Sequence, residues 1–454
     1  MKGQIMGFKT SYGIVAAVAA HMFAAAGAQA LPSPSSRNFD VRDFGAKGDG
    51  VAKDTAALQA AIDAATAAGG GRVVLSGGTF LTGAIALKTG VELHIDRTAR
   101  LLASPDVKDF PDWNAKHVVT ENLPRARSAC VIFADEAERI AITGDGVIDC
   151  NGQHHVREKA DPNWTGWKFE RVHPMTNSLP RVVFFAGCRD VAIRDVTMTN
   201  QPAGWSYWIH DCDRVQIRGL KVLADVRYPN NDGIHVNCSR DVTISDCIIE
   251  TGDDSIIVRA NSRSLRENKP CERVVVNNCT LRSWSAGIRI GWTNDGVIRD
   301  SSFSNIVMHD TTVGISMSLP ANLNGHGWTD YGREATLVEG LSFCNIRMRG
   351  ICGRAILATV ASEENGTAFD AMRDIQFVDV HASGRGLPLI RGRQGRPFTN
   401  WTFSGCSFRR IPESELPDWR RHGAGAWRRL SDDMGFVTQH ASGFRFDGTV
   451  LDAP

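Results

Sequence analysis

One pattern recurs in the middle of the chain, in Val191-Ala-Ile-Arg-Asp-Val, Val215-Gln-Ile-Arg-Gly-Leu and Val242-Thr-Ile-Ser-Asp-Cys. In each segment two apolar residues flank a variable one, a polar turn residue comes next or one position later, and an apolar residue closes the unit. Alternation with a period of two is typical of a short, half-buried strand. Asp, Asn and Gly tolerate the left-handed backbone of a tight turn. The pattern therefore predicts a strand followed directly by a turn.

The pattern continues along most of the chain, with further copies beginning at Val91, Ile140, Val274, Ser301, Leu341, Ile375 and Trp401. Between Val191 and Ser301, consecutive copies lie 24, 27, 32 and 27 residues apart. Repeats of this length that consist of strands and turns indicate a solenoid, whose coils stack about 4.8 Å apart and bury one another's apolar faces. We expect an all-β fold, a right-handed single-stranded parallel β-helix over residues 31–410.

The two ends of the predicted solenoid differ from its middle. Asp54-Thr-Ala-Ala-Leu-Gln-Ala-Ala-Ile-Asp-Ala-Ala reads as an amphipathic helix, with Asp54 as its cap and Leu58, Ile62 and Ala65 as its apolar stripe. Such a helix would cover the open end of the first coil. Residues 411–454 lose the repeat, and we expect an irregular C-terminal cap or tail there.

The N-terminus has the features of an export signal. Lys2 and Lys9 precede an apolar run from Ile14 to Ala26, and Ala28-Gln29-Ala30 is a small-x-small cleavage site. We expect residues 1–30 to be a signal peptide, and the mature chain to be secreted or periplasmic without a membrane anchor. Losing the two lysines changes the formal net charge from +1 to −1, which argues against a nucleic-acid partner.

The eleven cysteines form no CxxC pair and no cluster with metal-ligand spacing. Many fall within or beside the repeated strands, where a small buried side chain fits. We therefore expect neither a metal nor a cofactor.

Two segments about one coil apart carry the acidic residues of interest, Pro229-Asn230-Asn231-Asp232-Gly233-Ile234-His235 and Thr251-Gly252-Asp253-Asp254-Ser255-Ile256-Ile257. Successive coils would bring Asp232, Asp253 and Asp254 together on one face. Clustered carboxylates indicate acid/base hydrolysis of a glycosidic bond. Asp253 and Asp254 are consecutive, so both can face the same way only at a corner or a bulge.

The chain resembles the polygalacturonase family, glycoside hydrolase family 28, within the pectin-lyase-like β-helix superfamily. The resemblance rests on the acidic segments, on Asn38-Phe-Asp-Val-Arg-Asp-Phe-Gly-Ala-Lys-Gly-Asp-Gly, and on Leu179-Pro-Arg-Val-Val-Phe-Phe-Ala-Gly-Cys-Arg-Asp-Val with the following Asn200-Gln-Pro and Trp205. It implies an inverting glycosidase of pectic or related cell-wall polysaccharide. Asp254 would be the general acid, and Asp232 and Asp253 would hold and activate the water.

The chain departs from the family pattern at two places. The family's Gly-His-Gly corresponds to Ser285-Ala286-Gly287, and its Arg-Ile-Lys, which holds a substrate carboxylate, falls near Ile315-Ser316-Met317-Ser318. Candidate substrate-binding residues that remain are Asn230, His235, Arg259, Arg289, Trp205 and Trp292. These departures favour a related pectic or cell-wall glycoside, with a neutral or less charged sugar at the cleavage point.

Other classes of function remain open on the sequence. The same carboxylates would suit Ca²⁺ and hence a metal-dependent polysaccharide lyase. A non-catalytic glycan-binding β-helix or a structural tailspike would also have this fold. In the favoured hypothesis the partner is a polysaccharide or oligosaccharide, and the enzyme is a monomer.

Overall fold

The computed structural model describes residues 37–119, 128–159, 168–171, 181–293, 295–319, 335–360, 371–394, 397–416 and 435–452. The signal peptide expected over residues 1–30 lies outside these ranges. Within them, no helix combines the length and apolar character needed to cross a membrane.

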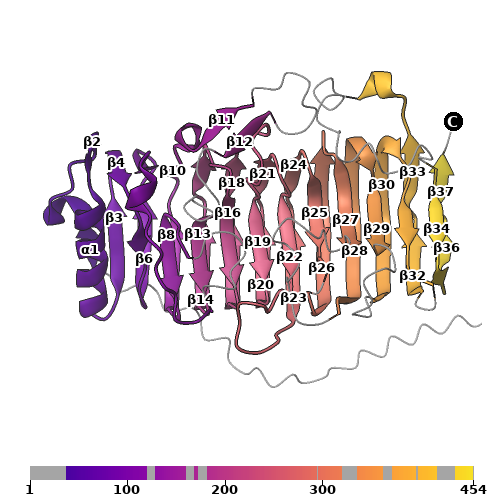
Figure 1. The fold of residues 1–454 in the computed structure, drawn as a ribbon, viewed down its shortest axis with the longest axis horizontal. Coiled ribbons are helices and arrows are strands. Elements are labelled where there is room, and N and C mark those ends of the chain that lie inside the picture. Colours follow the sequence, from indigo (N-terminus) through magenta and orange to yellow (C-terminus); the bar gives the residue numbers. More distant parts are fainter. Residues whose placement is uncertain are drawn as a thin grey trace, which may run out of the picture. The chain divides into compact units, whose positions relative to one another are not determined.

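The strands run in three parallel series, along which each strand pairs with its counterpart one coil further on (Figure 1). The first series comprises β1 (Asn38–Asp40), β3 (Gly71–Leu75), β6 (Val91–Ile95), β9 (Glu138–Thr143), β14 (Arg189–Arg194), β17 (Asp213–Arg218), β20 (Arg240–Ser245), β23 (Cys271–Asn277), β26 (Val297–His309), β28 (Leu337–Arg354), β30 (Ala371–Gly386), β32 (Phe398–Ser404), β35 (Ala441–Ser442) and β36 (Arg445–Asp447).

The second series shares the long strands β26, β28 and β30 with the first, because there the chain turns the corner without leaving the sheet. Its other members are β2 (Asp49–Lys53), β4 (Gly78–Thr82), β7 (Ala99–Ala103), β10 (Val147–Asp149), β15 (Thr197–Thr199), β18 (Lys221–Leu223), β21 (Ile248–Thr251), β24 (Thr280–Ser283), β33 (Ser407–Arg410) and β37 (Val450–Asp452).

The third series, here called the site sheet, has eleven strands. They are β5 (Ile85–Ala86), β8 (Ile132–Asp135), β13 (Arg181–Ala186), β16 (Trp205–His210), β19 (Ile234–Asn237), β22 (Ile256–Arg259), β25 (Ala286–Ile290), β27 (Val313–Leu319), β29 (Ile356–Val360), β31 (Leu389–Arg391) and β34 (Val437–Gln439). A separate antiparallel pair, β11 (Val156–Glu158) with β12 (Phe169–Arg171), lies outside the three series.

This architecture confirms the predicted parallel β-helix. The pairing registers place all ten predicted repeat positions, from Val91 to Trp401, opposite one another on successive coils. The turn prediction also holds, since non-glycine residues with positive φ are mostly Asp and Asn, among them Asp195 (66°) and Asn278 (55°).

The core is a stack of equivalent side chains, as coil stacking requires. Phe303, Phe343, Phe377 and Phe403 lie on successive coils, with ring centroids 4.8–4.9 Å apart and nearly parallel planes. All four are fully buried. All eleven cysteines are free thiols, and ten of them are buried. Seven of them belong to the main core, where they act as small fillers.

Helix α1 (Thr55–Ala67) covers the first coil at the end drawn in indigo (Figure 1). Leu58, Ile62 and Ala65 are fully buried, as their spacing predicted. Asp54 is the N-cap residue, as expected, but its carboxylate makes no capping hydrogen bond to the helix. It accepts hydrogen bonds from the backbone amides of Lys47 (2.6 Å) and Gly48 (2.9 Å) instead, and so fixes the preceding turn.

The C-terminal end differs from the irregular cap expected over residues 411–454. Of that segment, residues 437–452 form strands β34 to β37, which pair in parallel with β31, β32 and β33 as one further coil. Phe446 stacks on Phe403 at 5.1 Å and extends the aromatic ladder. The repeat was missed because this coil is the last, so its residues are largely exposed and lack the apolar alternation.

Candidate active site

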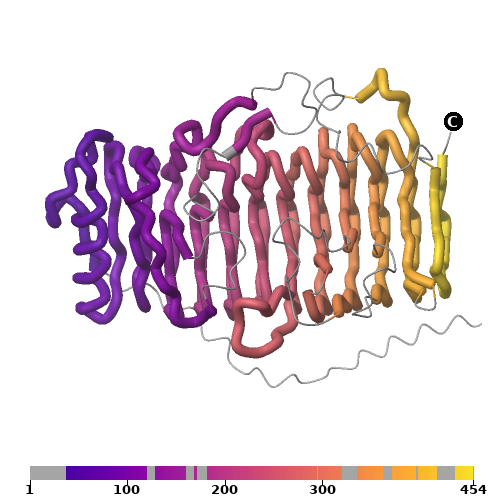
Figure 2. The backbone as a smooth tube through the Cα atoms, in the orientation of Figure 1, coloured from indigo at the N-terminus to yellow at the C-terminus, as the bar shows by residue number. Residues whose placement is uncertain are grey.

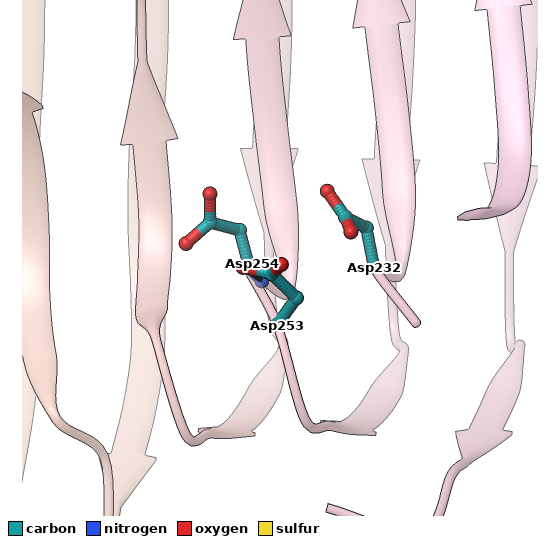
Figure 3. A group of neighbouring side chains, drawn as sticks. All are labelled: Asp232, Asp253 and Asp254. Carbon is teal, nitrogen blue, oxygen red and sulfur yellow. Dashed lines mark hydrogen bonds between the residues drawn. The ribbon is translucent and has the colours of Figure 1, made fainter. Parts of the chain in front are cut away.

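The three candidate carboxylates come from two neighbouring coils. Asp232 immediately precedes Gly233 and β19, while Asp253 and Asp254 lie in the turn between β21 and β22 (Figure 3). Ile234 pairs with Ile256, so Asp232 and Asp254 occupy the same position on successive coils. One carboxylate oxygen from each of the three lies within 4.8 Å of the other two. The structure therefore brings together the trio that the sequence singled out.

A corner of the coil lets Asp253 and Asp254 serve one site although they are consecutive. Asn231 shapes this corner from the preceding coil, because its Oδ1 accepts hydrogen bonds from the amides of Gly252 (2.6 Å) and Asp253 (3.2 Å). The hydroxyl of Ser283, on the following coil, donates to the Asp253 carbonyl at 2.7 Å. The backbone that carries the two acids is thus tied to the coils on either side.

The carboxylates differ in their partners. The Asp254 Oδ1 accepts a 2.9 Å hydrogen bond from the Ala286 amide, and its Oδ2 lies 3.5 Å from the Arg289 Nε. The Asp253 carboxylate accepts hydrogen bonds from the Asn230 Nδ2 and from the Asp254 amide, both at 3.0 Å. Asp254 therefore has a cation beside it, whereas Asp253 has neutral donors. This difference gives two neighbouring acids distinct environments.

Arg289 reaches from β25 toward the positions where the family has its basic residues. Its Nη1 donates a 3.2 Å hydrogen bond to the Ser316 Oγ, and its Nη2 lies 3.5 Å from the Ser318 carbonyl. The guanidinium carbon sits 4.4 Å from the centre of the Trp292 ring, a cation–π contact. The Nε is buried and has no hydrogen-bond partner among the described residues, so it remains a donor that faces Asp254.

Arg259 is engaged elsewhere. It forms a two-bond ion pair with Asp295, in which the Nη2 donates to Oδ1 at 2.7 Å and the Nε contacts Oδ2. Burial raises the pKa of Asp295, although Arg259 opposes this shift. The guanidinium also lies over Trp292 at 5.5 Å. Arg259 and Arg289 therefore both contact Trp292. The charge of Arg259 is already paired with the Asp295 carboxylate.

His235 lies in an aromatic setting. Its ring is 4.3 Å from that of Trp205 and 6.3 Å from that of Trp208. Burial, with the nearby Arg259 and Arg181 adding to it, holds the pKa of His235 well below its usual range. His235 is therefore neutral near pH 7 and cannot replace a missing cation. Its buried Nδ1 has no hydrogen-bond partner in the part of the chain that the structure describes.

Most of the predicted site residues meet in one place. The structure groups Asn230, Arg289 and Trp292 with the acids, places His235 and Trp205 beside Asp232, and directs Arg259 to Asp295. Sequence reasoning missed two residues that the geometry identifies. Asn231 was missed because the sequence beside Asp232 predicts only a turn there, and its hydrogen bonds to the next coil are tertiary contacts. Arg181, which is fully buried against Trp208 at 3.8 Å, was hidden because its partner lies on another coil.

The family model for glycosyl hydrolases family 28 matches residues 113–415, which is more than half of the chain and includes all three acids. The chain belongs to this family. A second model, rhamnogalacturonase A/epimerase, pectate lyase-like, matches residues 38–106. The chain is thus a polygalacturonase-like glycoside hydrolase, an enzyme that hydrolyses glycosidic bonds.

Curated relatives of this family 28 enzyme agree with that assignment. A probable polygalacturonase from Vitis vinifera is 29% identical over 396 residues, which cover 83% of this chain and 75% of the relative. An endo-polygalacturonase from Pectobacterium carotovorum subsp. carotovorum is 24% identical over 72% of this chain and 77% of its own.

Among solved structures, the exopolygalacturonase from Thermotoga maritima superposes with a TM-score of 0.67 over 93% of both chains, at 20% identity. At that identity the likeness establishes the shared parallel β-helix fold. The relatives include enzymes named as endo-acting and as exo-acting, so the family alone does not decide where along a polymer this chain cuts.

Proposed function

We propose that this family 28 enzyme hydrolyses a pectic polysaccharide by acid/base catalysis at Asp232, Asp253 and Asp254. The observation that carries the proposal is the meeting of these three carboxylates within 4.8 Å. In the mechanism, Asp254 donates a proton to the glycosidic oxygen as the C–O bond breaks. Asp232 and Asp253 hold the attacking water and take its proton.

Arg289 is the residue that we assign to bind the substrate beside the acid. A galacturonate carboxylate needs a cation, and the family positions for one hold Ala286, Ser316 and Ser318. The position of its guanidinium supports the assignment, because the Nε lies 3.5 Å from the Asp254 Oδ2. A sugar carboxylate bound beside the acid would gain a charge-assisted hydrogen bond from this guanidinium. Trp292 holds the guanidinium flat and offers an aromatic face nearby.

We propose inversion as the stereochemical course. In inverting glycosidases the two carboxyl groups typically lie about 6.5–9.5 Å apart, and in retaining ones about 5–5.5 Å. The distance here, 4.8 Å or less, joins one oxygen from each carboxylate of the trio, whereas the ranges for the two mechanisms refer to the separation of whole carboxyl groups. What supports inversion is the presence of two further carboxylates that can share one water. Proton NMR of the first product, before mutarotation, tests it: a β-anomer from an α-linked polymer is expected, and an α-anomer would establish retention.

A metal-dependent lyase is the second candidate, because the same three carboxylates could ligate a cation. Arg289 argues against this reading, since its guanidinium already lies 3.5 Å from Asp254. A divalent cation bound to Asp254 would meet that positive charge at close range.

The deciding experiment measures reducing-sugar release from polygalacturonate, rhamnogalacturonan and neutral pectic side chains, with and without EDTA. Asp254→Asn is expected to abolish release, because the amide keeps the shape of the side chain but is too weak an acid to protonate the leaving oxygen. Asp246→Asn is the matched control, since it makes the same change at an exposed turn of the same coil. Release that EDTA removes, together with an unsaturated product that absorbs in the ultraviolet, would replace the hydrolase by a lyase.

We further propose that the enzyme acts outside the cytoplasm as a monomer. The support for the location is the export-signal pattern over residues 1–30, and the monomer is a prediction made from the sequence. Sequencing the N-terminus of the protein recovered from its host should begin near residue 31. Size-exclusion chromatography with light scattering should give the mass of one mature chain.

A further inference from the structure

Four of the seven cysteines in the main core lie in two pairs, and each pair spans two neighbouring coils. In the first pair, the Asp213 amide donates a 3.0 Å hydrogen bond to the Cys188 carbonyl. The strands on either side keep the same register, since β13 pairs with β16 before the two cysteines and β14 pairs with β17 after them. Cys188 and Cys212 therefore occupy the same position one coil apart, and both are fully buried.

The second pair repeats this arrangement in the coils that follow. The Thr280 amide donates a 2.9 Å hydrogen bond to the Cys247 carbonyl, between the paired strands β20–β23 and β21–β24. Cys247 and Cys279 thus also occupy one position on successive coils, and they are only 1% and 2% exposed. Figure 2 shows the backbone of these neighbouring coils side by side along the solenoid.

The two thiols of each pair interact with each other. Burial, and after it the hydrogen bond with the Cys188 thiol, raises the pKa of the Cys212 thiol. The hydrogen bond with the Cys279 thiol, together with burial, raises the pKa of the Cys247 thiol. A thiol with a raised pKa is a poor nucleophile. Any chemistry between these sulfur atoms therefore belongs to the stage of folding before the coils close around them.

Coil stacking sets a separation that suits a disulfide. Coils stack about 4.8 Å apart, and a disulfide joins Cα atoms that are about 4.4–6.8 Å apart. A bridge therefore requires rotation of the two side chains but no movement of the coils. In the first pair the thiols now point to the carbonyls of Ala186 and His210, each at 3.5 Å. These long hydrogen bonds are all that the rotation would break in the protein backbone's surroundings.

We propose that Cys188 with Cys212, and Cys247 with Cys279, form two disulfide bonds that join neighbouring coils when the enzyme folds outside the cytoplasm. The structure contains the reduced form, with all four as free thiols. Disulfides form and persist in oxidising compartments outside the cytoplasm. The inference takes this location from the proposal made above, and it adds a modification at residues outside the catalytic site.

Each bridge forms by exchange with a disulfide of a folding catalyst or of a small molecule. The thiolate of one cysteine attacks a sulfur atom of this oxidant and releases one oxidant thiol. The thiolate of the partner cysteine then attacks the mixed disulfide and releases the second oxidant thiol. The chain loses two protons and two electrons in forming its S–S bond, and the oxidant gains them as two thiols.

The second bridge would join the coils that hold the catalytic acids. Cys247 lies six residues before Asp253. Cys279 lies four residues before Ser283, whose hydroxyl donates to the Asp253 carbonyl at 2.7 Å. The site is already assembled in the reduced structure, so the bridges are not needed to form it. Their effect is on the unfolded chain, whose freedom a crosslink between distant residues restricts.

The test counts thiols in the mature enzyme recovered from outside its host and unfolded in an alkylating reagent without reductant. Mass spectrometry should show seven alkylated cysteines, which is eleven minus the four in the two pairs, and eleven after reduction. Peptide mapping should identify the peptides joined through Cys188 with Cys212 and through Cys247 with Cys279. Eleven alkylated cysteines without reduction, or bridges between other cysteines, would overturn the inference.

A refolding experiment makes the result independent of the export proposal. The fully reduced enzyme is unfolded and then refolded in a buffer of oxidised and reduced glutathione. We expect the refolded and active enzyme to contain the same two bridges. An active enzyme that keeps eleven thiols under these conditions would overturn the inference, wherever the natural protein is located.

Two serine variants assign the second bridge. Cys247→Ser should leave Cys279 without a partner, so eight of the ten remaining cysteines should be alkylated without reductant. Cys406→Ser is the matched control, because Cys406 is also a core thiol but has Val380 at its position on the preceding coil. It should keep both bridges, so that six of ten cysteines are alkylated. The same number in both variants would contradict the assignment.

Discussion

The Arg289 Nε lies 3.5 Å from the Asp254 Oδ2, and the two side chains are only 5% and 9% exposed. One guanidinium thus serves the proposed general acid and is also the cation closest to it among the predicted substrate-binding residues. Arg259 is paired with Asp295, and His235 is neutral. A substrate carboxylate that binds here must share Arg289 with Asp254. This arrangement differs from a site with separate basic residues, and it makes Arg289 the residue on which substrate preference depends.

Replacing Arg289 should therefore affect catalysis more than stability. Arg289→Lys keeps the charge but loses the flat contact with Trp292 and the hydrogen bond to Ser316, and we expect kcat/KM to fall about tenfold or more, the equivalent of one charge-assisted hydrogen bond. Arg289→Ala should lower kcat/KM about 100-fold or more, because it removes the charge as well. The measurement is steady-state kinetics on polygalacturonate and on a fully methyl-esterified pectin.

The comparison between the two polymers separates binding from positioning. If Arg289 binds a sugar carboxylate, the loss is larger on the charged polymer. Equal losses on both would show that Arg289 acts through Asp254 alone. Arg273→Lys, an exposed arginine that pairs with Asp241 on the far side of the coil, should leave both rates unchanged.

Placing a histidine at position 286, where the family has one, should not increase the activity. Ala286 is fully buried and packs with Val313 and Leu357, so the imidazole of Ala286→His has no space. Overpacking of this kind typically costs about 1–3 kcal/mol. Chemical denaturation should show this loss of unfolding free energy, with activity no higher than that of the unmodified enzyme. A stable and more active Ala286→His variant would contradict the packing argument.

The aromatic ladder predicts where stability resides. Phe343 is fully buried between Phe303 and Phe377, and Phe343→Ala should lower the unfolding free energy by about 3–5 kcal/mol. Phe446 ends the ladder and is 45% exposed. Phe446→Ala should cost well under half of that amount. Denaturant titration measures both, and similar losses would show that the last coil is as tightly packed as the middle.

Two loops, residues 112–119 and 261–270, contact each other and both reach Asp211, through His117 and Lys269, and this contact should depend on pH. The hydrogen bond to Asp211 raises the pKa of His117. Burial acts to raise the pKa of Asp211, but hydrogen bonds from His117 and Lys269 outweigh it and lower that pKa. The His117 contribution is complete below its unfolded pKa, about 6.5, and is lost as the pH rises through the raised value. The Asp211 contribution is complete above about 3.9 and is lost as the pH falls through the lowered value.

Hydrogen exchange at the Val119 amide, which bonds to Ser264 across the two loops, measures this effect. After correction for intrinsic exchange rates, protection should be greatest between about pH 4 and pH 6.5 and should fall toward pH 9. Asp211→Asn should remove most of the pH dependence. Protection that increases from pH 6 to pH 9 in the unmodified chain would be inconsistent with the ion pair.

The fold and the meeting of the three candidate carboxylates could be predicted because both follow from short-range sequence patterns. Alternation with turn residues fixes which side chains enter the core, and stacking then places equivalent residues of successive copies against each other. Asp232 and Asp254 meet for the same reason as Val215 and Val242. The corner that Asp253 and Asp254 required is present, and Asn231 builds it.

The C-terminal coil and the Asp54 cap show the limits of such patterns. The last coil is exposed, so its residues need not alternate. Asp54 is a residue type that commonly caps a helix with its side chain, but its carboxylate accepts hydrogen bonds from two amides of the preceding turn instead.

The sequence by itself determined the β-helix, its register and the position of three carboxylates, since each depends on neighbours one coil away in a regular stack. Only the tertiary structure decided which cation faces Asp254, because Arg259, Arg289 and His235 look equivalent in the sequence. Their partners are set by loops and burial: Asp295 takes Arg259, and burial keeps His235 neutral. The same holds for the two loops of residues 112–119 and 261–270, which lie far apart in the chain and meet only when the coils stack.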